Sequence, residues 1–266
     1  MIADIIQRRK SVRTYDGRPL ADADRAQLEA YLQSVDNPFG IPVAFRLLDA
    51  RPNRLTSPVI LGAEQYVAAK VARVPNCELA FGYSFERFCL KAASMGLGMV
   101  MLAATLSRDT FERAIEVGPN EVMPVASPVG YPAAKRSVRE SLMRKGIHAD
   151  ERLPFGSLFF DGGFDRPLSP ESAGPFGEAL ALLRLAPSAA NKQPWRAVVA
   201  GGSVHFYECK TVKDSPLGDI QKVDIGIGLA HFDLYLRESG KAGRFVEGDP
   251  GIKAPANTHY IITWTA

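Results

Sequence analysis

The strongest concentration of side chains that could do chemistry lies near the N-terminus, in the run Arg8-Arg9-Lys10-Ser11-Val12-Arg13-Thr14-Tyr15. Guanidinium groups bind phosphate through paired N–H donors, and a serine hydroxyl adds a neutral donor. The run lies at the C-terminal end of an expected short helix over residues 2–9, where cations also interact favourably with the helix dipole. The spacing alone therefore predicts either an anion-binding segment or a solvated basic helix end.

Signatures of other common chemistries are missing from the sequence. It contains no GxxxxGK[ST] loop, no GxGxxG turn after a strand and no GxSxG elbow. The four histidines form no HxxxH or HExxH pattern, and no CxxC joins the three cysteines, so we expect no metal site and free thiols in a reducing cytoplasm. No side chain stands out as an acid/base centre. An enzyme whose bound cofactor carries the redox chemistry would not need one.

Composition places the chain among globular proteins. It has 266 residues, 46% hydrophobic and 23% charged, which fits one large domain or two smaller ones. The net charge, 32 − 29 = +3, is too small to predict a nucleic-acid partner. The basic run over 135–145 leaves nucleic-acid binding as a hypothesis, with a solvated face as the alternative. The most apolar stretch, 95–106, is shorter than the about 20 residues that span a bilayer, and the first residues do not resemble a signal peptide.

Hydrophobic periodicity predicts helices alternating with strands. We expect helices over 22–35, 83–102, 109–117, 176–185 and 224–238. Strands are expected over 43–48, 123–129, 197–200, 204–208 and 259–265, with a hairpin across Gly201-Gly202. The segment 154–175 is rich in Gly, Pro and Ser without a period, so it is interpreted as a wrapped connection whose phenylalanines need burial.

A weak internal repeat appears at a shift of 144 residues. Aligning 80–96 with 224–240 matches Gly82 with Gly226, Phe88 with Phe232, Leu90 with Leu234 and Gly96 with Gly240. The flanking helices and strands follow in the same order. The repeat predicts a duplicated domain, with a first half over 1–150, a connection over 151–175 and a second half over 176–266. Two unrelated α/β halves are the alternative.

Four segments resemble motifs of the nitroreductase family, the FMN-dependent NAD(P)H oxidoreductases. Residues 9–15 resemble its R-R-S-I-R-x-F segment, and Pro-Ser-Ala-Ala-Asn-Lys-Gln-Pro-Trp at 187–195 resembles its P-S-x-x-N-x-Q-P-W loop. Residues 92–98 are similar to its A-x-x-x-G-L-G helix end, and 128–132 to its P-x-G-Y-P turn. The order of the motifs departs from the family. There the P-S-x-x-N-x-Q-P-W loop lies between the first and the third of these motifs, but here that position holds a degenerate version at 36–42. The intact loop at 187–195, called the amide loop below, occurs in the second half.

The resemblance implies an α+β fold, with a mixed or antiparallel sheet flanked by helices and duplicated as a single-chain pseudo-dimer. Family members are dimers whose FMN is contacted by both chains. A fused pair would therefore take the phosphate side of one FMN from the first half and an amide from the second. The implied cofactor-binding residues are Arg9, Lys10, Ser11, Arg13, Pro128, Val129, Gly130, Lys135 and Arg136, followed by Ser188, Ala189, Asn191 and Gln193.

The implied reaction passes hydride from NAD(P)H through flavin N5 to a small acceptor such as a nitroaromatic or a quinone. The flavin carries this chemistry, so no catalytic side chain is expected, although Arg13 could stabilise charge on the reduced flavin. A flavin-binding module without turnover is the alternative. We expect a cytoplasmic pseudo-dimeric monomer, or a homodimer, with no nucleic-acid or membrane partner. The acceptor, the choice of NADH or NADPH, a second flavin site and a lid role for 150–175 stay open.

Overall fold

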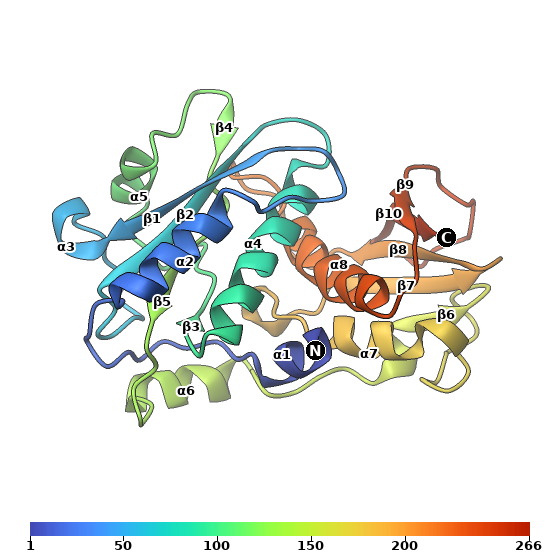
Figure 1. Ribbon diagram of the computed structural model, residues 1–266. Coiled ribbons are helices and arrows are strands. Elements are labelled where there is room, and N and C mark those ends of the chain that lie inside the picture. Colours follow the sequence, from blue (N-terminus) through green and yellow to red (C-terminus); the bar gives the residue numbers. More distant parts are fainter. The chain divides into compact units, whose positions relative to one another are not determined.

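The computed structural model describes residues 1–266 and divides into two compact units (Figure 1). The N-terminal unit is Arg8–Ala149, and the C-terminal unit combines Met1–Gln7 with Asp150–Ala266. The first seven residues were expected in the first half, but they belong with the C-terminal unit. There the Ile2 amide donates to both carboxylate oxygens of Glu238, at 3.0 and 2.8 Å. The segment 151–175, expected as a separate connection, is also part of the C-terminal unit.

The N-terminal unit is built on an antiparallel sheet of five strands. Its order is β1-β2-β5-β3, with β4 also paired to β2. The strands are β1 (Val43–Asp49), β2 (Gln65–Ala72), β3 (Gly98–Met99), β4 (Glu121–Val122) and β5 (Ala126–Gly130). Its helices are α2 (Asp22–Leu32), α3 (Ala50–Asn53), α4 (Cys77–Ser94), α5 (Arg108–Ala114) and α6 (Val138–Gly146). Helix α1 (Ile2–Arg8) belongs to the C-terminal unit except for its last residue, Arg8.

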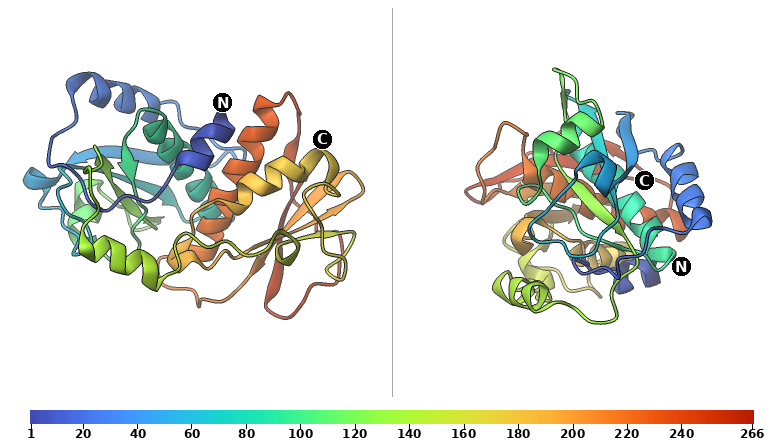
Figure 2. Two further views of the ribbon diagram at one scale, coloured as in Figure 1. Left: turned by 90° about the horizontal axis from the view of Figure 1, so that it is seen from below. Right: turned by 90° about the vertical axis from the view of Figure 1, so that its left-hand side faces the viewer.

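Helix α4 forms the core of this unit. It packs against β1, β2 and β3, as the two views in Figure 2 show. Phe81, Phe85 and Phe88 have no exposed surface. A helix that is apolar on nearly every side is typical of a buried helix, so hydrophobic burial of α4 holds the sheet and the surrounding loops together.

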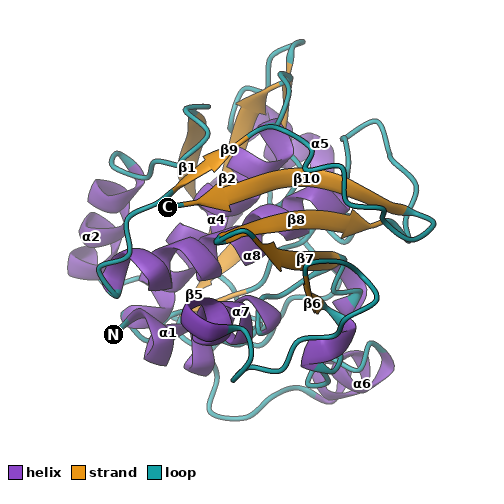
Figure 3. Cartoon of the chain, turned by 90° about the vertical axis from the view of Figure 1, so that its right-hand side faces the viewer, coloured by secondary structure: helices purple, strands orange, loops and turns teal.

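The C-terminal unit has a second five-stranded sheet, in the order β6-β7-β8-β10-β9 (Figure 3). Its strands are β6 (Phe159–Asp161), β7 (Trp195–Ala200), β8 (Ser203–Cys209), β9 (Arg244–Val246) and β10 (Thr258–Thr265). Only β6 is parallel to its neighbour. The helices are α7 (Gly177–Arg184) and α8 (Ile220–Glu238), with short 3₁₀ turns at Phe155–Ser157, Gly174–Phe176 and Ala189–Asn191. Strand β6 gives the wrapped segment a place in the core, where Phe159 is fully buried.

The two sheets confirm the duplication. Across the sheets, the order of neighbouring strands β1-β2-β5-β3 in one unit corresponds to β7-β8-β10-β9 in the other. The equivalent helices α4 and α8 also end in the same way. Gly96 and Gly240 follow them at φ +77° and +74°, in the left-handed region that favours glycine. The amide of the next residue donates back to Ala92 O at 3.0 Å in one unit and to Leu236 O at 2.9 Å in the other.

Several predicted boundaries were wrong for local reasons. The helix expected to reach residue 102 stops at Ser94, because the left-handed Gly96 ends it before β3. Helix α8 starts at Ile220, four residues before the expected start, because the Asp219 carboxylate caps it. The predicted hairpin across Gly201-Gly202 is confirmed, with both glycines at positive φ as its tight turn requires. No helix combines the length and apolar character needed to cross a bilayer.

Candidate functional site

The basic segment singled out by the sequence lies in the N-terminal unit beside β3. Ser11 forms a parallel bridge with Met99, and the Val12 amide donates to Met99 O at 3.0 Å. Gly98 allows this approach, because a Cβ there would lie 2.7 Å from Val12 Cβ. Gly130 faces Tyr15, whose Cδ1 would be 3.3 Å from an added Cβ. Both glycines of the recognised motifs therefore let the basic segment pack closely on the sheet.

Tyr15 fixes the end of this segment. The residue is 5% exposed. Its hydroxyl donates to Val12 O at 2.9 Å, and Gly98 O is a second, longer acceptor at 3.3 Å. Burial raises the pKa of Tyr15 well above its usual value, so it stays a neutral donor. A buried aromatic anchor at this position limits how far the preceding arginines can move.

Helix α6 contacts the same segment through polar side chains. The Thr14 hydroxyl donates to Glu140 Oε2 at 2.7 Å, and the Ser137 amide donates to Thr14 Oγ1 at 3.1 Å. One turn further on, Arg144 Nη1 donates to Ser11 O at 3.4 Å. Glu140 and Arg144 are only 3% and 7% exposed. The basic run was expected as a solvated face or a phosphate-binding pair, yet it folds into a helix that buries one carboxylate and one guanidinium.

The arginines of the basic segment carry buried N–H donors that lack acceptors. Arg13 Nε and Nη1 are buried without a hydrogen-bond partner, and Arg9 Nε has only a loose ion pair, 3.6 Å from Glu86 Oε1. Burial lowers the pKa of Arg13; Glu140 opposes this and Arg144 adds to it. Buried donors without acceptors cost free energy. An anion with several oxygens, such as a phosphate monoester, would supply the missing acceptors, so the residues present fit a phosphate group.

The other predicted residues of the first half lie either in the sheet or on the exposed surface. Pro128 and Val129 are buried within β5, paired with β2, while Gly130 pairs with Gly98. The remaining cations, Lys10, Lys135 and Arg136, are exposed. The cation beside Ser11 is instead Arg144, which the sequence analysis did not select. Its signal was the Ser137-Val-Arg-Glu140 capping box, which predicts a helix and places Arg144 one turn after Glu140.

The amide loop at 187–195 lies in the C-terminal unit, where a buried carboxylate holds it. The Ala189 amide donates to both Asp224 oxygens, at 3.1 and 3.0 Å, and the Gln193 amide donates to Ser188 Oγ at 2.9 Å. Asp224 is 3% exposed, and burial raises its pKa well above the usual value. Ala190, Asn191 and Gln193 all have φ near +50°, unusual for residues other than glycine. The loop is therefore strained and held by its contacts.

The side-chain amides of this loop bind the chain that enters the C-terminal unit. Asn191 Nδ2 donates to Glu151 O at 3.1 Å, and Arg152 Nη1 donates to Asn191 Oδ1 at 3.3 Å. Gln193 Oε1 accepts from the Leu153 amide at 2.9 Å. These contacts fasten residues 151–153 to the loop. The flavin contacts implied for Ser188, Ala189, Asn191 and Gln193 stay predictions.

The degenerate loop at 36–42 is tied to its own unit in a comparable way. Asn37 Nδ2 donates to Ser84 Oγ at 3.1 Å on α4 and to Ile41 O at 2.7 Å. Its Oδ1 accepts from the Phe39 amide at 3.1 Å. Each unit therefore anchors this loop to its central helix, but only the N-terminal unit carries the R-K-S-V-R segment.

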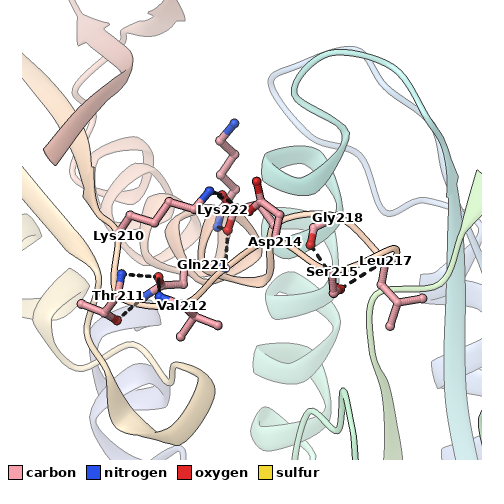
Figure 4. Close-up of polar contacts among 10 residues, drawn as sticks. Lys210, Thr211, Val212, Asp214, Ser215, Leu217, Gly218, Gln221 and Lys222 are labelled. Atoms are coloured by element: carbon pink, nitrogen blue, oxygen red, sulfur yellow. Dashed lines mark hydrogen bonds and ion pairs between the residues drawn. The ribbon is translucent and has the colours of Figure 1, made fainter. Parts of the chain in front are cut away.

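A second polar cluster combines Glu208 of β8 with the loop that follows and the start of α8; Figure 4 shows the contacts of the loop and of α8. Lys210 Nζ donates to Asp214 and to Asp219, both at 2.6 Å. Gln221 Oε1 accepts from two loop amides, at 2.7 and 2.8 Å. Glu208 is 1% exposed beside Asp219. Burial first, and then Asp219, raises the pKa of Glu208 to about 7, although Lys210 and Lys222 oppose the rise.

This cluster predicts a pH dependence of stability. Because the carboxyl of Glu208 binds its proton more tightly folded than unfolded, its contribution is fully present below about pH 4.5 and is lost as pH rises through about 7. The free energy of unfolding should fall by about 1–3 kcal/mol over that range. Glu208→Gln should remove this fall, whereas Asp214→Asn, at an exposed carboxylate whose pKa Lys210 lowers, should not. Urea unfolding of the parent and both variants across this pH range measures these changes. If the free energy of unfolding depends on pH in the same way in the parent and in Glu208→Gln, the role of Glu208 is refuted.

Comparison with known proteins agrees with this fold. Residues 1–235 match the family described as "Putative TM nitroreductase". A putative nitroreductase from Thermotoga maritima aligns at 19% identity and TM-score 0.65, covering 99% of this chain and 91% of that one. A putative NADH dehydrogenase/NAD(P)H nitroreductase from Bacteroides thetaiotaomicron aligns at 23% identity and TM-score 0.43, covering 51% and 89%. An FMN- and NADPH-dependent nitroreductase from a Sphigopyxis strain aligns at 12% and 0.43, covering 52% and 91%.

The search of curated proteins returned no match. No group of three or more His, Cys, Asp or Glu side chains is arranged to hold a metal ion. The family match extends over most of the chain and includes the basic segment and the amide loop. The resemblance seen in the sequence is thereby confirmed, and the chain belongs to the TM nitroreductase family, with the nitroreductase fold duplicated in one polypeptide.

Proposed function

We propose that the protein is an FMN-dependent oxidoreductase that takes hydride from NAD(P)H and passes it to a small acceptor such as a nitroaromatic or a quinone. The observation that carries the proposal is the set of buried, unsatisfied N–H donors on Arg9 and Arg13. They occur in the segment that resembles the family's phosphate-binding motif. Membership of the family supports FMN as the phosphate-bearing molecule.

The residues of the N-terminal unit would each have a defined task. Arg9 and Arg13 would donate to the phosphate, and the Ser11 hydroxyl would add a neutral donor. Arg144, which donates to Ser11 O, would add positive charge behind these donors. Glu140 would offset the charge of the arginines when no anion is bound. When bound, FMN supplies the hydride chemistry at N5. The positive charge of Arg13 would favour a cofactor that becomes more negative on reduction.

Only the N-terminal unit carries the basic segment, so we propose one FMN per chain. For the loop at 187–195, Asn191→Ala is predicted to alter FMN affinity or reduction potential if its amide also contacts the flavin. Because that amide bonds to Glu151 O, the variant needs a parallel unfolding measurement. A change in FMN affinity without a loss of stability would support a flavin contact, and a loss of stability alone would assign Asn191 to the fastening of residues 151–153.

Purified protein titrated with FMN tests the function. We expect saturable flavin binding at one per chain, followed by bleaching of the bound flavin on addition of NADH or NADPH without oxygen. Recovery of the flavin spectrum with a nitroaromatic or quinone would complete the cycle. Protein that binds no flavin would contradict the proposal. Protein that binds flavin but is bleached by neither NADH nor NADPH would instead be a flavin-binding module without reductase turnover.

A further inference from the structure

Helix α6 exposes apolar side chains and buries charged ones. Val138 and Leu142 are 77% and 66% exposed, among the most exposed large apolar residues of the chain. They are four residues apart and so share one helix face. Glu140 and Arg144, also four apart, point almost the opposite way and are buried. A helix whose apolar face points to solvent indicates that this face binds something.

The exposed face is also strongly basic. Four cations at or beside it are exposed and form no ion pair: Lys135, Arg136, Arg139 and Lys145. Only Arg139 has a hydrogen-bond partner, the carbonyl oxygen of Pro58. The single acidic residue of 135–145, Glu140, lies on the buried face. Positive charge around an apolar centre therefore meets solvent without a compensating carboxylate, which selects for an anionic partner.

We propose that this outer face of α6, centred on Val138 and Leu142 and flanked by the four cations, binds peripherally to an anionic lipid surface without crossing the bilayer. The two apolar side chains would enter the boundary between headgroups and acyl chains, and the cations would lie at the lipid phosphates. Long cationic side chains can reach the headgroups while their stems cover apolar surface.

The chemistry of the face favours lipid over other anionic partners. A nine-residue helix is about 14 Å long and offers only part of the roughly 800 Å² that each side of a stable protein interface contributes. A lipid surface deforms around an isolated helix and needs no matching shape. Nucleic acid would satisfy the cations but would leave Val138 and Leu142 in water. The charge run alone predicted a solvated face; the apolar pair inside it changes that interpretation.

Vesicle co-sedimentation of the full chain tests the proposal. Vesicles of equal parts phosphatidylcholine and phosphatidylglycerol are compared with pure phosphatidylcholine. The double variant Val138→Gln/Leu142→Gln removes the apolar pair with a good helix former. The variant Lys145→Gln removes one cation. Val212→Gln/Lys213→Gln is a matched control, because it removes an exposed valine and an exposed lysine from a loop of the other unit.

We expect the parent to bind the anionic vesicles, not to bind the neutral ones, and to dissociate from the anionic vesicles when salt is added. The apolar double variant should bind at least about tenfold more weakly, and Lys145→Gln about fivefold more weakly. The control should match the parent, and FMN binding should be unchanged in the double variant. The proposal is overturned if the parent does not bind anionic vesicles, if it binds neutral vesicles equally well, or if the double variant binds like the parent. Binding to polyglutamate or duplex DNA without binding to vesicles would equally overturn it.

Discussion

Replacing Arg13 with alanine is expected to weaken FMN binding about 10- to 150-fold. Arg13 has two buried guanidinium nitrogens without acceptors, and a hydrogen bond from a charged donor contributes about 1.5–3 kcal/mol. The dissociation constant is measured by fluorescence quenching of FMN on titration with protein. Arg9→Ala should act in the same direction with a smaller effect, because Arg9 keeps Glu86 as a partner in the absence of an anion.

Arg18 provides the matched control for Arg13. It lies five residues after Arg13, but its guanidinium is exposed and already paired with Asp16 at 2.8 Å. Arg18→Ala should leave FMN affinity unchanged. If Arg13→Ala and Arg18→Ala bind FMN as tightly as the parent, the phosphate does not bind at the basic segment.

Replacing Glu140 with alanine should give the largest loss of stability of any variant considered for the N-terminal unit. Glu140 is buried, accepts from Thr14 at 2.7 Å and offsets the charge of Arg13. Removing one partner from a buried charge network costs about 3–5 kcal/mol, because the remaining cations stay buried without a counter-ion. The free energy of unfolding should therefore fall by about 3 kcal/mol, measured by urea denaturation.

The same change should strengthen anion binding, which separates a counter-ion from an ordinary packing residue. Without Glu140, inorganic phosphate or FMN becomes the main counter-charge for Arg13 and Arg144. Added phosphate should then recover part of the lost stability, more in the variant than in the parent. Glu140→Gln keeps a partner for Thr14 and should show the gain in phosphate affinity with a smaller loss of stability. Glu116→Gln, at an exposed partner of Arg46, should change neither quantity. Equal phosphate responses in Glu140→Gln and the parent would contradict the counter-ion role.

Sequence reasoning was most successful where a local pattern dictates the structure. The Gly201-Gly202 turn specifies its hairpin by backbone conformation alone, and Gly96 and Gly240 mark equivalent helix ends in the two units. The shift of 144 residues, weak as an identity count, was correct because those glycines and the buried Phe88 and Phe232 have equivalent places in the fold. Local signals of this kind need no knowledge of distant contacts.

The remainder depends on contacts that sequence spacing does not specify. The placement of residues 1–7 depends on the Ile2–Glu238 contact, 236 positions apart. The burial of Arg144 follows from the packing of α6 on Thr14 and Ser11, more than 120 positions away. The resemblance to the family pointed to the Lys135-Arg136 pair, which is exposed, and its contact with FMN stays a prediction. The motif at 187–195 gave its loop correctly, but it could not indicate that Asn191 and Gln193 bond to residues 151–153.

The most direct test of the phosphate site compares FMN with riboflavin, which lacks only the phosphate. We predict that the parent prefers FMN by at least about tenfold, as expected for charge-assisted contacts from buried arginines, and that Arg13→Ala reduces this preference severalfold while leaving riboflavin affinity nearly unchanged. If the parent binds both flavins equally, or if Arg13→Ala weakens both to the same extent, then the segment from Arg9 to Arg13 does not bind the phosphate of a flavin.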